Sequence, residues 1–240
     1  MNTMALATIP AMVSSCVSPE DIRKSPLRTD DVILFQGDSL TEGFRNYEYG
    51  HEPNTPQALG EGFVRVCAGA LLSKLCHQNL KIYNLGISGN TVGSLLGRWE
   101  NDCIKLKPDV INILVGVNDF YFRYWNMSEG SAEIYESEYR KLLSITKEKL
   151  PDVKIVICEP FAFTTDGEKV TDEWFPAFDE YREIARLMAQ EFETVFIPYQ
   201  AIFDRVCEKA PVEFWVPDGI HPGVAGYYLM AETWLKYFIQ

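Results

Sequence analysis

The sequence has 240 residues, of which 47% are hydrophobic and 23% are charged. This composition is typical of a folded globular protein and excludes a disordered or collagen-like chain. The formal net charge of −12 argues against nucleic acid as a partner, because phosphate groups need a basic surface. No apolar run reaches the 18 residues of a membrane-spanning helix, so no membrane span is predicted.

The length suits a single α/β domain. We expect an N-terminal arm over residues 1–30 and one domain over residues 31–240. The segment Val13-Ser14-Ser15-Cys16 resembles a lipoprotein cleavage box, but no Lys or Arg precedes Arg23, so the basic part of an export signal is missing. The six cysteines form no CxxC pair and most lie in apolar elements, which favours reduced thiols. We therefore predict a cytoplasmic protein, with export as a lipoprotein or in secreted form left open.

Apolar runs and helical periodicity predict an alternation of strands and helices along the whole chain. In chain order these are a strand over 32–35, a helix over 63–78, a strand over 81–87, a helix over 92–106, a strand over 110–115, a helix over 131–149, a strand over 154–158, a helix over 174–192, a strand over 195–197 and a helix over 223–239. Helical crossovers between successive strands imply a parallel sheet with helices on both faces. The predicted fold class is thus α/β, a three-layer α/β/α sandwich around a five-stranded parallel sheet.

Three of the helices carry an apolar stripe that should face the sheet. The stripes are Val64, Ala68, Leu71 and Leu75 in the first; Tyr135, Tyr139, Leu142 and Thr146 in the third; and Val224, Tyr228, Ala231, Leu235 and Phe238 in the last.

Three polar motifs follow the first three predicted strands. Ser39 comes after the first strand, Gly89 after the second and Asn118 after the third. Because ligands bind beyond the carboxyl ends of parallel strands, these residues should meet at one edge of the sheet.

Ser39 stands on a tight strand-to-helix turn, which would expose its hydroxyl and direct the following backbone N–H groups at a developing negative charge. Taken alone, a serine at a helix start is more often an N-cap. His221 is one of three histidines and precedes a proline at the entrance to the last helix. Asp218, three residues earlier, could accept a hydrogen bond from Nδ1–H and fix the tautomer, although for this motif taken alone an Asp-Gly turn at a helix start is the better explanation.

Gly89 and Asn118 are candidate oxyanion donors, because glycine permits a close backbone approach and an amide donates without charge. A plain turn and an Asx-turn are the structural alternatives. We expect Asp38 and Asp119 to brace their loops through backbone hydrogen bonds. The aromatic run over 120–125 could line a substrate pocket or pack beneath a loop.

No cofactor or metal is predicted. His51 and His77 lack ligand-like spacing to other histidines or cysteines, and the sequence contains neither a dinucleotide-binding glycine motif nor a phosphate loop.

These motifs together resemble the four blocks of the SGNH hydrolases, also called GDSL esterases and lipases. The blocks are Gly37-Asp38-Ser39, Gly89 of Ile87-Ser88-Gly89-Asn90-Thr91, Asn118 of Gly116-Val117-Asn118-Asp119, and His221 of Asp218-Gly219-Ile220-His221-Pro222. The resemblance spans about residues 32–239 and implies a flavodoxin-like fold and ester hydrolysis without a cofactor. It further implies that Ser39 is the nucleophile and His221 the general base, that Asp218 completes the triad, and that the Ser39 N–H, Gly89 and Asn118 form the oxyanion hole.

We therefore predict a serine ester hydrolase that acts through an acyl-enzyme on a small-molecule ester. Deacetylation of a carbohydrate is the first interpretation, because the chain shows no long apolar lid for a fatty chain. A lysophospholipase or thioesterase of broader acyl range is the alternative within this class. In a different class, a non-catalytic flavodoxin-like module that binds a ligand is the alternative. The oligomeric state cannot be read from one chain.

Overall fold

A computed structural model describes residues 27–167 and 169–239. The predicted N-terminal arm, apart from residues 27–30, and the segment Val13–Cys16 lie outside the described residues. The strands of the described part are β1 (Val32–Gly37), β2 (Lys81–Asn84), β3 (Val110–Leu114), β4 (Lys154–Cys158) and β5 (Val195–Ile197). The α-helices are α2 (Ser39–Glu42), α3 (Pro56–Leu59), α4 (Phe63–Lys74), α5 (Val92–Trp99), α6 (Val117–Tyr124), α7 (Ala132–Lys149), α8 (Ala177–Glu191), α9 (Tyr199–Cys207), α10 (Val212–Trp215) and α11 (Val224–Leu235).

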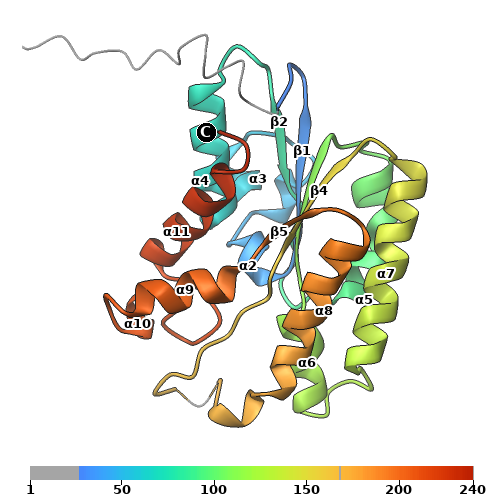
Figure 1. Ribbon diagram of the computed structural model, residues 1–240. Coiled ribbons are helices and arrows are strands. Elements are labelled where there is room, and N and C mark those ends of the chain that lie inside the picture. The colour runs from blue at the N-terminus through green and yellow to red at the C-terminus, as the bar shows by residue number, and fades with distance from the viewer. Residues whose placement is uncertain (1–26, 168, 240) are drawn as a thin grey trace, which may run out of the picture.

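The five strands form one parallel sheet in the order β2-β1-β3-β4-β5. Helices α4 and α11 pack together on one face, and α5, α7 and α8 cover the other (Figure 1). This is the strand order of flavodoxin-like folds, so the predicted three-layer sandwich is confirmed. Every residue of β3 is buried, as expected for a central strand that is covered on both faces.

The predicted apolar stripes of α4 and α7 are confirmed, since all their members are buried. The stripe predicted for the last helix is wrong in part, because only Ala231 and Phe238 of its members are buried. Val224 is 91% exposed and Tyr228 is 61% exposed, whereas Met230 and Trp234 are fully buried. This helix is apolar on nearly every side, so the periodicity of its apolar residues does not define which side faces the sheet.

Several elements differ from the predicted boundaries. The predicted helix over 92–106 is α5 followed by one π-helical turn, η2 (Glu100–Ile104). The predicted helix over 174–192 is a 3-10 turn, η3 (Asp172–Trp174), and α8. The helix start expected at Ser39 is α2. The short helices α3, α9 and α10, together with the 3-10 turn η1 (Tyr47–Tyr49), lie in segments for which no helix was predicted. Helix α6 contains the aromatic run over 120–125 except for its last residue.

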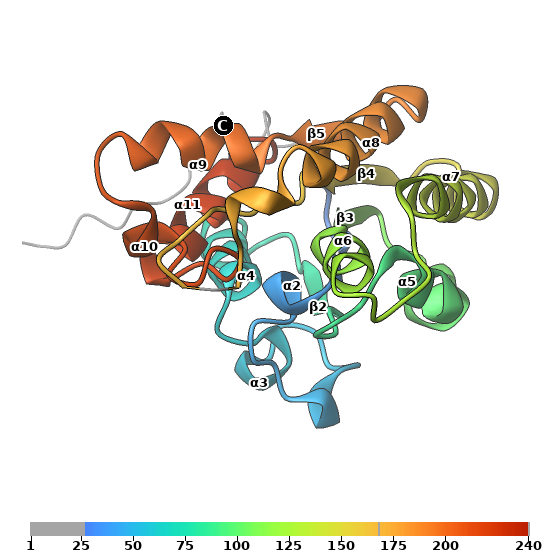
Figure 2. The same ribbon diagram turned by 90° about the horizontal axis from the view of Figure 1, so that it is seen from below.

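The carboxyl ends of the strands open onto one edge of the molecule. Figure 2 shows this edge, with α2 near its centre and α6 and α10 on opposite sides of it. The residues that follow β1, β2 and β3 all reach this edge, as the sequence predicted.

Candidate active site

Ser39 is the first residue of α2, directly after β1. The preceding Asp38 caps the helix, because its Oδ1 accepts a hydrogen bond of 3.0 Å from the Leu40 N–H. Asp38 is fully buried. Burial raises the pKa of its carboxyl to about 7, against the Leu40 hydrogen bond and the nearby His221, which both lower it. The prediction that Asp38 braces its loop through a backbone hydrogen bond is confirmed.

The turn before Ser39 has no room for a side chain. A Cβ atom on Gly37 would collide with the Leu114 carbonyl oxygen and the Thr41 Oγ1. The backbone of Gly37 therefore lies directly against β3 and α2, and this close packing fixes the position of the turn that carries Ser39.

Asn84, at the end of β2, connects the loop after β2 to helix α2. Its buried side-chain amide donates to the Thr41 carbonyl at 2.8 Å and to the Leu59 carbonyl at 2.9 Å. Its Oδ1 accepts from the Gly86 N–H at 3.0 Å. Sequence reasoning missed this residue. The available signal was a polar side chain in a strand of a sheet whose faces are both covered.

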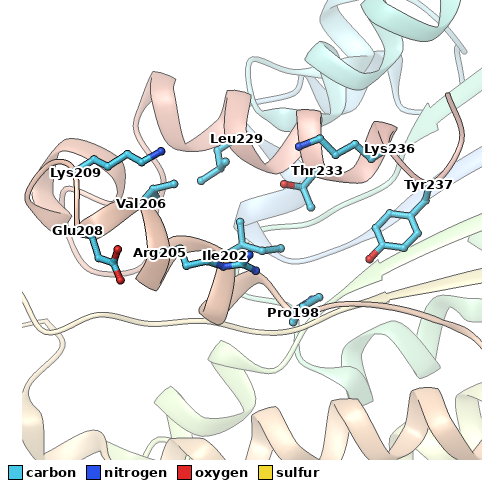
Figure 3. A pocket seen from close by; sticks show the side chains of 10 residues that line it. All are labelled: Pro198, Ile202, Arg205, Val206, Glu208, Lys209, Leu229, Thr233, Lys236 and Tyr237. Atoms are coloured by element: carbon cyan, nitrogen blue, oxygen red, sulfur yellow. The ribbon is translucent and has the colours of Figure 1, made fainter. Parts of the chain in front are cut away.

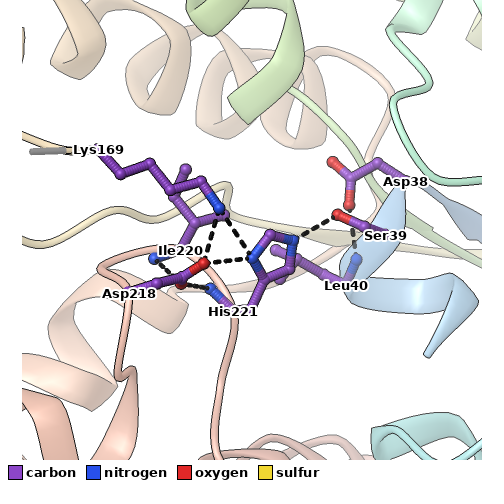
Figure 4. A network of polar contacts seen from close by, with 7 residues as sticks. All are labelled: Asp38, Ser39, Leu40, Lys169, Asp218, Ile220 and His221. Carbon is purple, nitrogen blue, oxygen red and sulfur yellow. Dashed lines mark hydrogen bonds and ion pairs between the residues drawn. The ribbon is translucent and has the colours of Figure 1, made fainter. Parts of the chain in front are cut away.

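Ser39, His221 and Asp218 form a continuous chain of contacts (Figure 4). The Ser39 Oγ lies 2.9 Å from His221 Nε2, and His221 Nδ1 lies 2.8 Å from Asp218 Oδ2. The other carboxylate oxygen of Asp218 accepts from the backbone N–H groups of Ile220 at 3.0 Å and of His221 at 2.6 Å. The structure thus brings together three residues that the sequence placed up to 182 positions apart.

The Asp218 carboxylate is held in its charged form. Burial acts to raise its pKa, but the hydrogen bonds from His221, Lys169 and the two backbone N–H groups outweigh burial and hold the pKa well below its usual range. A permanently charged carboxylate next to Nδ1 can stabilise a positive imidazolium ring.

Lys169 is a member of this cluster that sequence reasoning missed. Its Nζ lies 2.6 Å from Asp218 Oδ2 and 3.2 Å from His221 Nδ1. It comes from the segment between β4 and α8, which no motif links to the residues around His221.

The two candidate oxyanion donors lie side by side. Gly89 has a φ of +78°, a conformation that favours glycine, and the nearest atom to its virtual Cβ is Phe122 Cζ at 3.9 Å. Asn118, one helical turn before Phe122, donates its side-chain amide to the Asn90 carbonyl at 3.2 Å. Asn118 and the loop that contains Gly89 are therefore neighbours at the same edge as Ser39.

Asp119 braces the start of α5, as predicted. Its Oδ1 accepts from the Val92 N–H at 3.0 Å, while its Oδ2 is buried without a hydrogen-bond partner. Burial raises the pKa of this carboxyl to about 7.

The aromatic residues of the run over 120–125 are partly buried and partly exposed. Phe120 is buried against Trp174, Phe178 and Tyr181, so here the packing alternative is correct. Trp125 is half exposed.

His51 and His77 are both exposed. In residues 27–167 and 169–239, no group of three or more His, Cys, Asp or Glu side chains could hold a metal ion. A separate groove of about 600 Å³ lies between α9 and α11 (Figure 3). Ser39, Asp218 and His221 do not line this groove.

The model of the GDSL-like Lipase/Acylhydrolase family matches residues 35–229. The chain belongs to this family. An acetylxylan esterase of Geobacillus stearothermophilus is 32% identical over 206 residues, which cover 85% of this chain and 92% of that protein. Its crystal structure superimposes with a TM-score of 0.78 and 30% identity over 88% of this chain and 95% of that chain. A structure from Parabacteroides merdae, named as a GDSL-like lipase, gives a TM-score of 0.84 and 44% identity over 88% and 97% of the two chains.

As a member of this family, the chain is a carboxylic ester hydrolase. Family membership argues against the alternative of a non-catalytic binding module. A third relative, from Bacillus subtilis, is named an uncharacterized lipoprotein and is 29% identical over 48% of this chain and 40% of that protein. No helix in the described part of the chain has the length and apolar character needed to cross a membrane.

Proposed function

We propose that Ser39, His221 and Asp218 are the catalytic triad of an acetyl esterase that removes acetyl groups from a carbohydrate. The observation that carries this proposal is the unbroken contact from the Ser39 Oγ through both nitrogens of the His221 ring to the Asp218 carboxylate, with distances of 2.9 and 2.8 Å. A hydroxyl, a base within hydrogen-bond distance and a group that orients the base are the parts required for nucleophilic attack on an ester.

The reaction begins with proton transfer. The charged Asp218 accepts a hydrogen bond from the Nδ1–H group, which leaves the lone pair of Nε2 directed at the serine hydroxyl. As the Ser39 Oγ attacks the ester carbonyl, its proton passes to Nε2, and the resulting imidazolium is stabilised by Asp218. The ring then gives this proton to the departing sugar hydroxyl, and an acyl-enzyme forms. Water repeats the attack with the same base and releases acetate.

The negative oxygen that forms during each attack needs hydrogen-bond donors. The Ser39 N–H lies at the start of α2, the Gly89 N–H lies in a glycine turn, and the Asn118 side chain provides an amide. In this role the Asn118 amide exchanges its hydrogen bond with the Asn90 carbonyl for one with the substrate oxygen. Removing one such donor typically costs about 3–4 kcal/mol of barrier height.

The choice of acetate on a sugar has two supports. The Phe122 ring lies next to Gly89 and fills space beside the proposed oxyanion donors, which favours a short acyl group. In addition, the 32% identical relative from Geobacillus stearothermophilus is an acetylxylan esterase. Catalytic mutants of that esterase replace an aspartate and a histidine three residues later, the same spacing as Asp218 and His221.

The test is hydrolysis of acetylated xylooligosaccharides by the purified protein and by the Ser39→Ala variant. We expect Ser39→Ala to lose at least about three orders of magnitude in kcat, while Ser73→Ala, at an exposed position of α4, keeps wild-type activity. Retained turnover by Ser39→Ala would remove Ser39 from the mechanism.

A series of esters with acyl chains of increasing length separates an acetyl esterase from the alternative, a lysophospholipase or thioesterase. We expect kcat/KM to fall steeply beyond the shortest acyl groups. A rise with acyl length would overturn the choice of acetate.

A reducing compartment, the cytoplasm, is the proposed location. Cys67, Cys103 and Cys158 are buried free thiols, and reduced buried thiols are typical of such compartments.

A further inference from the structure

Between β4 and α8, residues 161–167 and 169–176 contain side chains that pack against the turn before His221; we call these residues the strap. Figure 4 shows Lys169 of the strap reaching its ammonium group toward Asp218 and His221. Its Nζ lies 2.6 Å from Asp218 Oδ2 and 3.2 Å from His221 Nδ1. The lysine therefore contacts two of the three proposed triad residues.

The strap is fitted closely to the turn between Asp218 and His221. The Phe163 N–H donates to the Gly219 carbonyl at 2.8 Å, and the side chain of Val170 is fully buried. Gly219 has a φ of +81°, and a Cβ atom there would collide with the Phe163 carbonyl and lie 3.1 Å from Val170 Cγ2. Because the residue after Lys169 is packed in this way, the backbone of the lysine is held over the carboxylate.

Three distances describe how Lys169 and His221 share the Asp218 carboxylate. Nζ and Nδ1 lie 2.6 and 2.8 Å from the same oxygen, Asp218 Oδ2, and 3.2 Å from each other. Two N–H donors thus share one acceptor oxygen, which a carboxylate accommodates. The arrangement has a consequence for the ring. A positive charge next to Nδ1 repels the imidazolium form, and the lysine takes part of the carboxylate charge that would otherwise stabilise it.

The other titratable groups around the ring act in different ways. Asp38, on the β1 side, attracts a positive His221, but burial raises the pKa of Asp38 to about 7, so this attraction is partial at neutral pH. Tyr227 on α11 stays neutral, because burial and the nearby Asp38, Glu42 and Asp218 raise its pKa to about 12. The positive charge of Lys169 thus counteracts the attraction of two carboxylates, Asp38 and Asp218, for a positive His221 ring. Of these two, Asp218 is fully charged.

We propose that Lys169 is a positioning residue of the proposed triad, which shares the Asp218 carboxylate with His221 and places a positive charge beside the ring. The lysine contacts Asp218 and His221 and acts through these two residues. This inference rests on their proposed roles in ester hydrolysis. Its consequence is that loss of the lysine charge should change the pH dependence of the reaction.

The test is the pH profile of kcat/KM for the wild type, Lys169→Met and Lys169→Arg, with a short acetate ester as substrate. We expect the midpoint of the acid limb to move up by roughly one pH unit in Lys169→Met, the size of a screened unit-charge interaction at this distance. Below the midpoint, kcat/KM of this variant should then be about tenfold lower than that of the wild type. Lys169→Arg keeps the positive charge, so the midpoint of its acid limb should lie close to that of the wild type.

Lys209→Met is the matched control. Lys209 is exposed and lines the groove between α9 and α11 (Figure 3), so its loss changes the net charge equally without touching the triad. We expect the acid limb of this variant to coincide with that of the wild type. An unmoved midpoint in Lys169→Met, or a kcat/KM that falls by one factor at every pH, would overturn the proposal and leave Lys169 a purely structural role.

A readout without substrate separates this proposal from the proposed function. The chain has three histidines, so the ring signals of His221 can be assigned by NMR after substitution of His51 and His77 by Gln. The titration midpoint of His221 should rise by the same amount in Lys169→Met. If the NMR midpoint moves but Ser39→Ala still hydrolyses esters, the function fails and the role of Lys169 stands. If Ser39→Ala is inactive and the NMR midpoint does not move, the role of Lys169 fails alone.

Discussion

The two halves of the proposed triad are held by different forces. Ser39 stands on a turn at the carboxyl end of β1, after the fully buried Asp38 and a Gly37 that has no room for a side chain. His221 and Asp218 lie on a loop near the end of the chain, and their side chains are 38% and 40% exposed. Their positions depend on hydrogen bonds to one charged carboxylate. Packing therefore fixes the Ser39 turn, whereas the side chains of His221 and Asp218 are oriented by charge, on a turn whose backbone the strap packs against.

This difference predicts which substitutions affect activity and which affect stability. Changes to the charged loop should lower the rate while the fold persists. Changes to the packed turn should lower the free energy of unfolding as well. The following predictions test that division, from the largest expected effect to the smallest.

Asp218→Asn removes the charge that orients His221. We expect kcat to fall by about 10⁴, the size typical for the carboxylate of a triad. The melting temperature should fall as well, because a carboxyl whose pKa the folded protein holds well below its usual range adds stability at neutral pH, but unfolding should remain cooperative. Steady-state kinetics and thermal unfolding measure the two quantities. A variant that loses its cooperative unfolding transition would contradict the claim that the fold persists without this charge.

Asn118→Ala removes one proposed oxyanion donor. We expect kcat to fall by about 10²–10³ with KM nearly unchanged, because this donor acts on the charge that develops in the transition state. The same kinetic assay measures the effect. An equal rise in KM without a change in kcat would place Asn118 in ground-state binding instead.

Gly37→Ala tests the packed turn. The added Cβ would meet the Leu114 carbonyl and the Thr41 Oγ1, so we expect a loss of about 2–3 kcal/mol in the free energy of unfolding, the usual cost of overpacking, measured in urea. Gly97→Ala is the control, because no atom lies within 4 Å of a Cβ at this position of α5. The control should be unchanged or slightly more stable. Equal stability of Gly37→Ala and the wild type would contradict the account of this turn.

Asp119→Asn tests the buried carboxyl beside Asn118. Burial raises the pKa of Asp119 to about 7, so the folded protein binds this proton more tightly than the unfolded chain. The stability that results is present below about pH 4 and is lost as the pH rises through 7. We expect the decrease in unfolding free energy between pH 5 and pH 8 to be smaller in Asp119→Asn by about 1.4 kcal/mol or more, the equivalent of one pH unit. An identical pH dependence in the two proteins would show that Asp119 does not titrate in this range.

The sheet could be predicted from the sequence because each strand is a short apolar run and each long crossover helix has a polar face. The apolar stripes of α4 and α7 followed directly from this contrast. The last helix has no such contrast, so its buried side around Met230 and Trp234 could not be deduced. Helix α9 follows the three-residue strand β5 after a single proline and has no side-chain cap, so no local signal separated it from a loop.

The contact between Ser39, His221 and Asp218 could be predicted because each of the three lies in a short motif. Asp218 and His221 are three residues apart, and Ser39 follows Gly37 and Asp38 at the end of a strand. Lys169 could not be predicted in this way. It lies 49 residues before Asp218, and only the path of the strap over Gly219 brings the two together. Asn84 was missed because its partners come from α2, from α3 and from the loop after β2.

The most direct test of the central claim is labelling of the purified protein with a serine-directed fluorophosphonate, followed by peptide mass spectrometry. Our account predicts one adduct, on the peptide that contains Ser39, and a labelling rate reduced by orders of magnitude in His221→Ala. An adduct on another residue, or labelling of Ser39 at the same rate without His221, would contradict it.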